Sequence, residues 1–272
     1  LSNFSGTYWD YDAFSVNVQD GDDTTTTGTF DVSQGKLEGL SLSSVEFTGT
    51  DEYIDTANSD SLSLTKTTIS GWINFDSLSG SLGNQDRIIG SEYYVDSNWT
   101  LNDHNTANRL TFSVGSGDYA FWGPSYATGE WHHFVLTYDS TEAAWADAVS
   151  FYWDGVPQSL EVSDGDTETL TTDRSVSIGG GDNSAAQFDG HLRDMRIYDY
   201  ALSADQAASL YSGDYNVTPL HWWKLDEGYT VAADANAVGA FEDSGTGTDA
   251  DGQGVDLVDA SCVNGTLDLN GT

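Results

Sequence analysis

The stretch HLRDMRIYDYALSADQAASLY, residues 191–211, combines a strand pattern with a helix pattern in a short space. Ser203 is a favourable N-cap residue, and Gln206 three positions later completes a capping box. Gly213 supplies a stop signal after the last periodic residue. The spacing therefore predicts a helix of about two turns that follows directly after a strand.

The strand half of this stretch changes its phase. Side chains on a regular strand alternate between faces, so Leu192 cannot share a face with Met195 and Ile197. A β-bulge near Arg193–Asp194 would bring the three apolar side chains together. We therefore expect an irregularity in the middle of this strand.

From about residue 30 to residue 198, strand patterns follow one another with turn signals between them. The segment TTISGWINFD alternates and places Trp72 on the face opposite to Ile73. Asp154-Gly155 lies between two apolar runs and predicts a hairpin. His132 and His133 are neighbours on a predicted strand, so they point to opposite faces and cannot chelate one ion together.

The charge of the chain is strongly negative: eight Lys and Arg against 44 Asp and Glu give a formal net charge of −36. Such a field repels phosphate backbones and anionic lipid surfaces, which argues against nucleic-acid and membrane binding. It also opposes compaction unless counterions screen it. The composition thus favours a salty or divalent-rich setting, or else serves solubility alone.

Length and composition favour a single large β domain. The chain has 272 residues with 12% aromatics, one Met and three Pro. The lone Cys262 excludes an intramolecular disulfide. No apolar run reaches the length of a membrane span, and the chain does not open with a signal-peptide pattern, so we expect such a peptide to be absent or removed.

Seven segments then carry a resemblance to a known family. In order they are VEFTGTDEYIDTANSDSLSLTKTTISGWINF, RIIGS, RLTFSVGSG, GEWHHFVLTYD, FYWDGV, SVSIGG and FDGHLRDMRIYDYALSADQAASLY. Together they resemble the laminin-G-like, concanavalin A-like jelly-roll domain of bacterial, archaeal and phage surface proteins, over about residues 40–212. The resemblance implies an all-β fold: a two-sheet antiparallel jelly-roll sandwich with one short helix after the last strand.

The chain ends are less regular. Residues 1–39 are predicted to form an N-terminal arm and a Thr-rich loop before a jelly-roll domain at 40–213. The extension 214–272 contains PLHWWKLDEG, which resembles the opening segment of the same family. It represents a truncated tandem domain, a strand that completes its own sandwich, or a strand donated to another subunit. Pairing within its own sandwich is the prediction we favour.

Catalytic motifs are weak. Glucanases of this superfamily carry an E-x-D-x-x-E strand motif, which this chain lacks. The acidic run Asp164–Glu168 has no flanking apolar pattern and is typical of a solvated loop. No serine elbow or phosphate-binding glycine loop is found. The sequence therefore predicts a protein that is not an enzyme.

The resemblance implies a structural Ca²⁺ site at the rim of the sandwich. Its ligands would be the turn Gly49, Thr50 and Asp51 together with Asp194, because hard cations take carboxylate and backbone carbonyl oxygens. A second, weaker candidate is the loop DADGQGVDLVD, which resembles a calcium loop with Gln in place of the third acid. Its potential ligands are Asp249, Asp251, Gln253, Asp256 and Asp259.

Aromatic residues near a Gly/Pro turn are candidates for ligand binding. Tyr119, Trp122 and Tyr126 lie in SGDYAFWGPSYATGEW, where aromatic faces could stack on sugar rings. The alternative is an ordinary strand in which Phe121 and Trp122 form one core and one rim residue.

Two functions of different class follow. The first is a non-catalytic structural or adhesion module on a cell exterior or virion surface, calcium-stabilised, which associates with copies of itself or binds glycans or other surface proteins. The second is a carbohydrate-binding module of a larger secreted adhesin or polysaccharide-degrading enzyme. The fold alone hosts both. Neither involves nucleic acid or insertion into a membrane.

Overall fold

The computed structural model describes most of the chain. The residues described are 13–19, 25–31, 36–38, 41–56, 62–77, 85–91, 98–104, 109–115, 117–170, 175–181, 187–213, 217–225, 241, 243–247, 251–255 and 262–266. The chain divides into two compact units, 44–263 and a second one made of 1–43 with 264–272. Among the described helices, none is both long enough and apolar enough to cross a bilayer.

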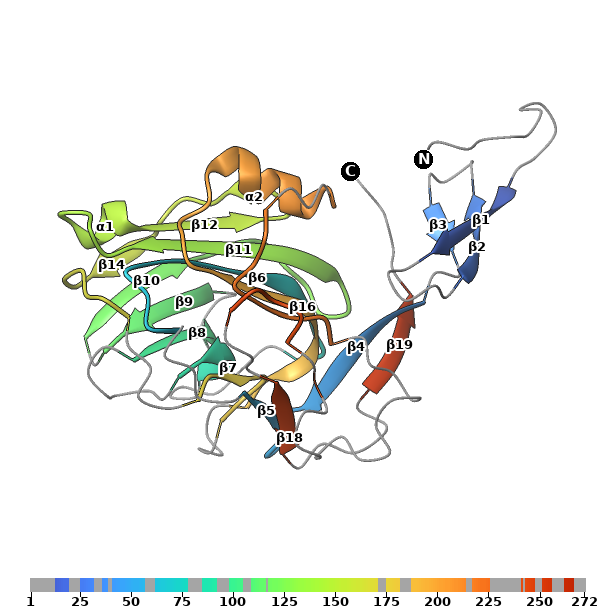
Figure 1. The fold of residues 1–272 in the computed structure, drawn as a ribbon, viewed down its shortest axis with the longest axis horizontal. Coiled ribbons are helices and arrows are strands. Elements are labelled where there is room, and N and C mark those ends of the chain that lie inside the picture. The colour runs from blue at the N-terminus through green and yellow to red at the C-terminus, as the bar shows by residue number, and fades with distance from the viewer. Residues whose placement is uncertain are drawn as a thin grey trace. The chain divides into compact units, whose positions relative to one another are not determined.

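Sheet I is one of the two large antiparallel sheets (Figure 1). Its strands in spatial order are β13 (Val156–Pro157), β12 (Val149–Trp153), β11 (Trp131–Asp139), β6 (Lys66–Phe75), β16 (Asp189–Tyr198), β4 (Ser41–Thr48) and β19 (Cys262–Thr266), with β17 (His221–Trp223) paired to β16. The predicted Asp154-Gly155 hairpin joins β12 to β13, with φ values of 50° and 76° at the two turn residues. Positive φ at both positions matches the twist of a tight hairpin.

Sheet II faces sheet I across the core (Figure 1). Its order is β14 (Val162–Asp164), β10 (Asp118–Trp122), β9 (Arg109–Val114), β8 (Trp99–His104), β7 (Gln85–Gly90), β15 (Ser177–Ile178), β5 (Tyr53–Thr56) and β18 (Gly252–Val255). The two sheets confirm the predicted all-β, two-sheet sandwich.

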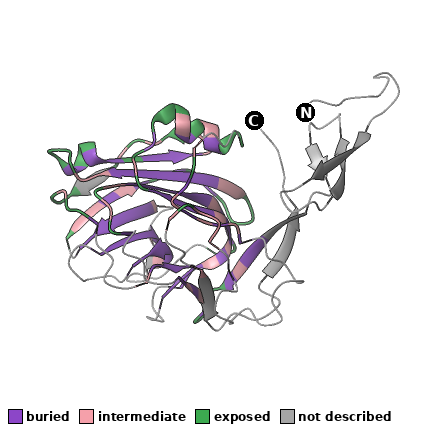
Figure 2. Ribbon diagram, viewed as in Figure 1, coloured by how far each residue is buried: buried purple, intermediate pink, exposed green. Residues whose placement is uncertain are grey.

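The core lies between the two sheets, where Figure 2 shows the strands as buried. Phe134 and Leu136 of β11 and Leu101 and Phe112 of sheet II are fully buried. Burial of each such side chain contributes about 1.5–3 kcal/mol. Trp122 of β10 stacks on Phe151 of β12 at 5.1 Å between ring centroids, so the two layers interlock directly.

The closing strand and its helix form as the sequence predicts. The register of β16 against β6 shifts between Arg193 and Arg196, which is the expected bulge. Met195 and Leu192 therefore both reach the core. Helix α2 (Ala204–Tyr211) begins after Ser203, whose capping box with Gln206 is present.

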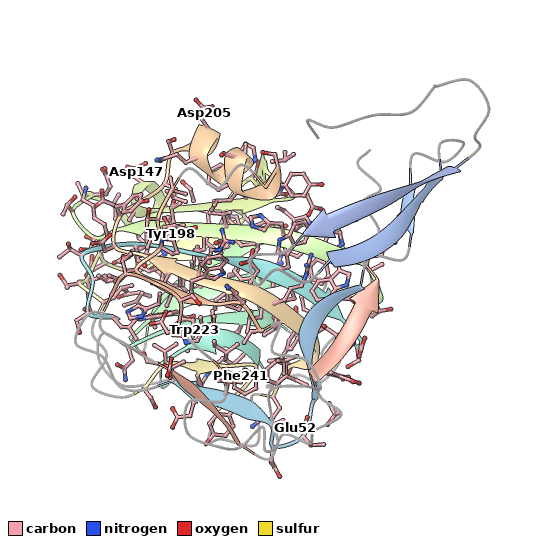
Figure 3. All side chains as sticks on the ribbon, turned by 45° about the vertical axis from the view of Figure 1, so that its right-hand side comes forward. Glu52, Asp147, Tyr198, Asp205, Trp223 and Phe241 are labelled. Carbon is pink, nitrogen blue, oxygen red and sulfur yellow. The ribbon has the colours of Figure 1, made fainter. Side chains whose placement is uncertain are left out.

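Helix α2 covers part of the outer face of sheet I (Figure 1). Its Ala207 and Leu210 pack with Val135 of β11 and Tyr152 of β12 in a small apolar cluster. The opposite side of the helix carries Asp205, which is exposed, as Figure 3 shows. A second helix, α1 (Trp145–Ala148), is a single turn between β11 and β12.

The C-terminal segment pairs with strands of its own chain. Strand β17 lies antiparallel to β16, with Trp223 opposite Met195, and β18 lies antiparallel to β5. Trp223 is fully buried and Phe241 is 1% exposed; Figure 3 labels both. Residues 214–263, expected as part of an extension, thus belong to the same compact unit as the sandwich.

The second unit contains a small antiparallel sheet of β1 (Ala13–Gln19), β2 (Thr25–Asp31) and β3 (Lys36–Glu38). The Thr-rich tract, predicted as a loop, contributes strand β2. Threonine is β-branched and favours extended backbone, which the loop prediction underestimated.

Candidate functional site

Sheet I turns one face to the core and the other, its outer face, away from sheet II. Two rows of side chains cross this outer face from strand to strand. In the first row, His133 of β11 lies opposite Trp72 of β6, which lies opposite Arg193 of β16. Directly opposed residues on neighbouring strands have Cβ atoms about 5 Å apart, so the three side chains are neighbours.

The second row lies two residues further along the same strands. Trp131 of β11 is opposite Asn74 of β6, Asn74 is opposite His191 of β16, and His191 is opposite Glu46 of β4. We call the residues of the two rows the outer patch: Glu46, Trp72, Asn74, Trp131, His133, His191 and Arg193.

An arginine sits between two tryptophans in this patch. The guanidinium carbon of Arg193 lies 5.0 Å from the ring centroid of Trp72 and 4.9 Å from that of Trp131. Both distances fall within the range of cation–π attraction. Arg193 is only 8% exposed, whereas both indoles are partly exposed. The arginine therefore fixes the two rings while they keep surface available to a ligand.

Helix α2 borders the outer patch through Tyr211. The Tyr211 ring centroid lies 5.9 Å from that of Trp72 and 6.1 Å from that of His133. Burial, reinforced by the positive charges of Arg196 and Arg193, lowers the pKa of His133 to about 3, against an opposing effect of Asp154. His133 is therefore neutral at physiological pH, whereas the guanidinium of Arg193 beside it carries a positive charge.

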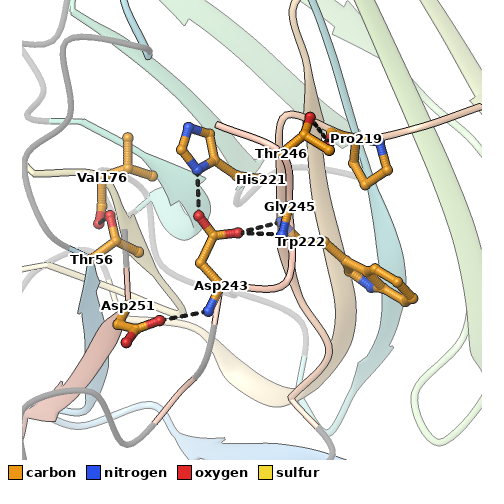
Figure 4. A network of polar contacts seen from close by, with 9 residues as sticks. All are labelled: Thr56, Val176, Pro219, His221, Trp222, Asp243, Gly245, Thr246 and Asp251. Carbon is orange, nitrogen blue, oxygen red and sulfur yellow. Dashed lines mark hydrogen bonds and ion pairs between the residues drawn. The ribbon is translucent and has the colours of Figure 1, made fainter. Parts of the chain in front are cut away.

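A buried histidine–aspartate pair joins two parts of the C-terminal segment, strand β17 and the stretch 243–247 (Figure 4). His221 Nδ1 lies 2.6 Å from Asp243 Oδ2, and both side chains are almost fully buried. Asp243 Oδ1 accepts hydrogen bonds from the backbone N–H of Trp222 at 2.8 Å and of Gly245 at 2.9 Å. Burial acts to raise the pKa of Asp243, but these donors hold it below its usual value.

The same arrangement occurs a second time in the fold. His132 Nδ1 lies 2.8 Å from Asp154 Oδ2, and the backbone N–H of His133 donates to Asp154 Oδ1 at 2.9 Å. In each case the aspartate accepts one hydrogen bond from the histidine ring and another from the backbone N–H of the residue that follows the histidine. Both pairs tie a loop to a strand end, so their geometry indicates a structural role.

Comparison with known proteins decides the family. The family described as the concanavalin A-like lectin/glucanases superfamily matches residues 48–208, more than half of the 272-residue chain. The chain belongs to this family. The match spans the strands that form the outer patch, apart from Glu46, which lies two residues before it.

Other similarities of this lectin/glucanase-like chain are more distant. A Bacteroides ovatus protein proposed to bind carbohydrate is 17% identical, with a TM-score of 0.57, over 85% of this chain and 61% of that one. A SAP-like pentraxin from Limulus polyphemus is 15% identical, with a TM-score of 0.48, over 62% of this chain and 82% of that one.

A curated rat (Rattus norvegicus) relative is the sushi, von Willebrand factor type A, EGF and pentraxin domain-containing protein 1. It is 33% identical over 102 residues, which are 33% of this chain and 3% of that protein. The chain thus spans 3% of the rat protein and 61% of the Bacteroides protein.

The residues expected to bind calcium at the rim do not come together. Gly49–Asp51 forms an exposed turn after β4, and a Cβ built on Gly49 lies 3.0 Å from the Cβ of Asp189. Asp194 lies five residues beyond Asp189 on β16, roughly 16 Å along a strand. Asp189, and not Asp194, is the carboxylate beside the turn.

Asp194 has another role. Its Oδ1 accepts hydrogen bonds from Arg196 Nη2 at 2.7 Å and from Trp222 Nε1 at 2.5 Å. Burial raises the pKa of Asp194, although Arg196 and Trp222 oppose the shift. Asp194 also adopts a positive φ of 55° at the bulge. The bulge directs this carboxylate to β17 and its neighbours, so Gly49, Thr50, Asp51 and Asp194 do not form one site.

The second predicted calcium loop is partly a strand. Gln253 lies in β18, opposite Asp55 of β5. Asp251 Oδ1 accepts a hydrogen bond from the backbone N–H of Asp243 at 2.8 Å (Figure 4). The other three predicted ligands lie outside the described residues: Asp249, Asp256 and Asp259. The described part thus supports strand pairing of this segment.

Two of the three aromatic residues proposed for ligand binding are core residues. Trp122 is 1% exposed and Tyr126 is 5% exposed, and Tyr126 Oη donates to Asp103 at 2.7 Å. Only Tyr119 is partly exposed, beside Phe121 at 5.0 Å between ring centroids. Trp122 is buried and Phe121 is partly exposed. This burial supports the alternative prediction, an ordinary strand with one core and one rim residue.

Proposed function

We propose that the chain is a non-catalytic module that binds glycans through the outer patch. The observation that carries this proposal is the pair of partly exposed indoles, Trp72 and Trp131, held by Arg193 on an open sheet face of a lectin-type sandwich. A flat indole offers a large apolar face at a low entropic cost, which suits stacking on a sugar ring.

The charge of the chain narrows the class of glycan. A formal net charge of −36 disfavours approach of polyanionic polysaccharides. The patch also contains the guanidinium of Arg193, whose N–H groups are donors of the kind that suits sugar hydroxyl groups. We therefore propose a neutral glycan as the ligand. The family and the fold support this proposal, since lectins share them, but the site carries the argument.

The location of the protein is part of the same proposal. A strongly acidic β-sandwich suits the exterior of a cell or virion, where salts screen its charge. Because β17 and β18 already pair with β16 and β5 of their own chain, neither is a spare strand for donation. Self-association is thus a separate proposal, which size-exclusion chromatography with light scattering tests.

Affinity electrophoresis through gels that contain one soluble polysaccharide tests the glycan proposal. Xylan, galactomannan and mixed-linkage β-glucan are the neutral probes, and alginate and hyaluronan are the acidic ones. We expect retardation by at least one neutral probe and at least about tenfold weaker retention of Trp131→Ala. Tyr119→Ala, on the outer face of sheet II, is the matched control and should bind as the wild type does.

Two results would contradict the proposal. One is equal binding by Trp131→Ala and the wild-type chain; the other is binding that only Tyr119→Ala removes. Release of reducing ends from a retarding polysaccharide would contradict the non-catalytic part alone, because that measurement is independent of where the glycan binds.

A further inference from the structure

Three side chains at one edge of the outer patch converge from separate segments of the chain. Glu46 lies on β4, His191 on β16, and Asp76 directly after β6. Each offers one ligand atom, and these atoms all lie within 4.8 Å of one another. His191 is opposite Glu46 in the register of β16 with β4, so the sheet itself sets their separation.

The closest measured pair matches the spacing of two ligands on one ion. His191 Nε2 lies 3.3 Å from Asp76 Oδ2. Zinc binds nitrogen and oxygen at about 2.0–2.2 Å, so two of its ligands are separated by about 3.0–3.4 Å for octahedral to tetrahedral angles. An ion pair between His191 and Asp76 also explains that distance. It does not explain why a second carboxylate, that of Glu46, lies beside the same imidazole.

A buried polar atom next to this cluster lacks a partner. Asn74 is 8% exposed, and its Oδ1 is buried without a hydrogen bond. Asn74 lies on the neighbouring strand opposite His191, on the same face of the sheet. Buried acceptors in folded proteins are nearly always satisfied, by protein, water or an ion. A bound cation, or a water molecule held by one, would satisfy this oxygen.

The ligand set selects among cations. Ca²⁺ and Mg²⁺ take oxygen ligands, and an imidazole nitrogen does not suit them. One imidazole with two carboxylates suits a borderline ion such as Zn²⁺, whose bonds to His, Asp and Glu are common. We propose that Glu46, Asp76 and His191 bind one divalent metal ion such as Zn²⁺, with Asn74 beside it. This site shares Glu46, Asn74 and His191 with the outer patch, but its test needs no glycan, so the metal proposal can fail while the glycan proposal stands.

The test uses the full-length chain without an affinity tag, freed of metal by chelation and dialysis. Titration calorimetry with ZnCl₂ in a non-chelating buffer should give one tight site per chain. His191→Ala and Glu46→Gln each remove one ligand and should weaken Zn²⁺ binding by at least about tenfold. Even mutation of residues that only hydrogen-bond to metal ligands lowers metal affinity by about tenfold or more. Glu142→Gln, an exposed acid elsewhere, is the matched control and should retain the site.

The visible absorption of Co²⁺ provides a second readout. It distinguishes a liganded site from diffuse attraction of cations to an acidic surface. Co²⁺ added to the metal-free chain should develop visible absorption typical of a nitrogen- and oxygen-liganded site, and Zn²⁺ should displace it. The same absorption should be missing in His191→Ala. Wild-type titrations with no stoichiometric step, or a His191→Ala chain that binds Zn²⁺ as the wild type does, would overturn the proposal.

Discussion

Replacement of Asp86 by Asn is expected to stabilise the protein at neutral and alkaline pH. Asp86 lies on β7 opposite Asp103 of β8. Burial raises the pKa of Asp86 to about 7, and the negative charges of Asp103 and Asp189 add to the shift. The folded chain therefore binds a proton here that the unfolded chain, with an ordinary pKa of 3.8, has already released.

The sign and size of the effect follow from linkage. Because the folded state binds more protons, the contribution of Asp86 to stability falls as pH rises from about 4 to 7. A shift of about three pKa units corresponds to about 4 kcal/mol without screening. Asp86 is only partly buried, so solvent reduces the expected cost to roughly 1–2 kcal/mol above pH 7.

Urea unfolding followed by tryptophan fluorescence, at constant ionic strength, measures this difference. Asp86→Asn should be about 1–2 kcal/mol more stable than the wild type at pH 8, which is several degrees in melting temperature for a unit of this size. The gain should shrink toward pH 4.5. Glu142→Gln is the control for removal of one charge. Equal gains at both pH values, or no gain at pH 8, would refute this reasoning.

Three further predictions concern stability. Asp243→Ala removes the carboxylate that pairs with the buried His221 and should lower the free energy of unfolding by about 3–5 kcal/mol, whereas Glu142→Ala should change it little; urea unfolding measures both. Zn²⁺ added after chelation should raise the melting temperature, since it binds the folded arrangement of Glu46, Asp76 and His191; no shift, or an equal shift in His191→Ala, would argue against this site. Raising NaCl from 10 mM to 1 M should raise the melting temperature, because the Debye length falls from about 30 Å to about 3 Å and repulsion among the acidic side chains is screened. A constant melting temperature would contradict the hypothesis that the protein needs salt.

Local features were predictable because their causes lie within a few residues. Ser203 and Gln206 form their capping box from adjacent backbone alone, and Asp154-Gly155 forms its hairpin through its own positive φ values. The bulge at Arg193 was predictable because the apolar phase breaks there. Sequence reasoning is reliable where one element contains the whole cause.

The candidate site was not predictable, because it depends on register across several strands. Trp72, Trp131 and Arg193 come from β6, β11 and β16, and only their pairing places the guanidinium between the two indoles. The alternation in TTISGWINFD did place Trp72 on the face opposite to the core residue Ile73. That was the signal in the sequence that pointed to the outer patch. Asp194 was misassigned for the same reason, since its partner Trp222 is contributed by a distant strand.

The most direct test of glycan binding at the outer patch is a map of tryptophan indole signals. The chain has nine tryptophans, each with an indole N–H that NMR of ¹⁵N-labelled protein observes separately. Trp72→Phe and Trp131→Phe assign the two patch signals. On titration with xylo-, manno- and cello-oligosaccharides, we predict that these two signals shift most, while that of the buried Trp122 stays in place. Binding that leaves both patch signals unmoved, or no shift with any of these neutral sugars, would contradict the account.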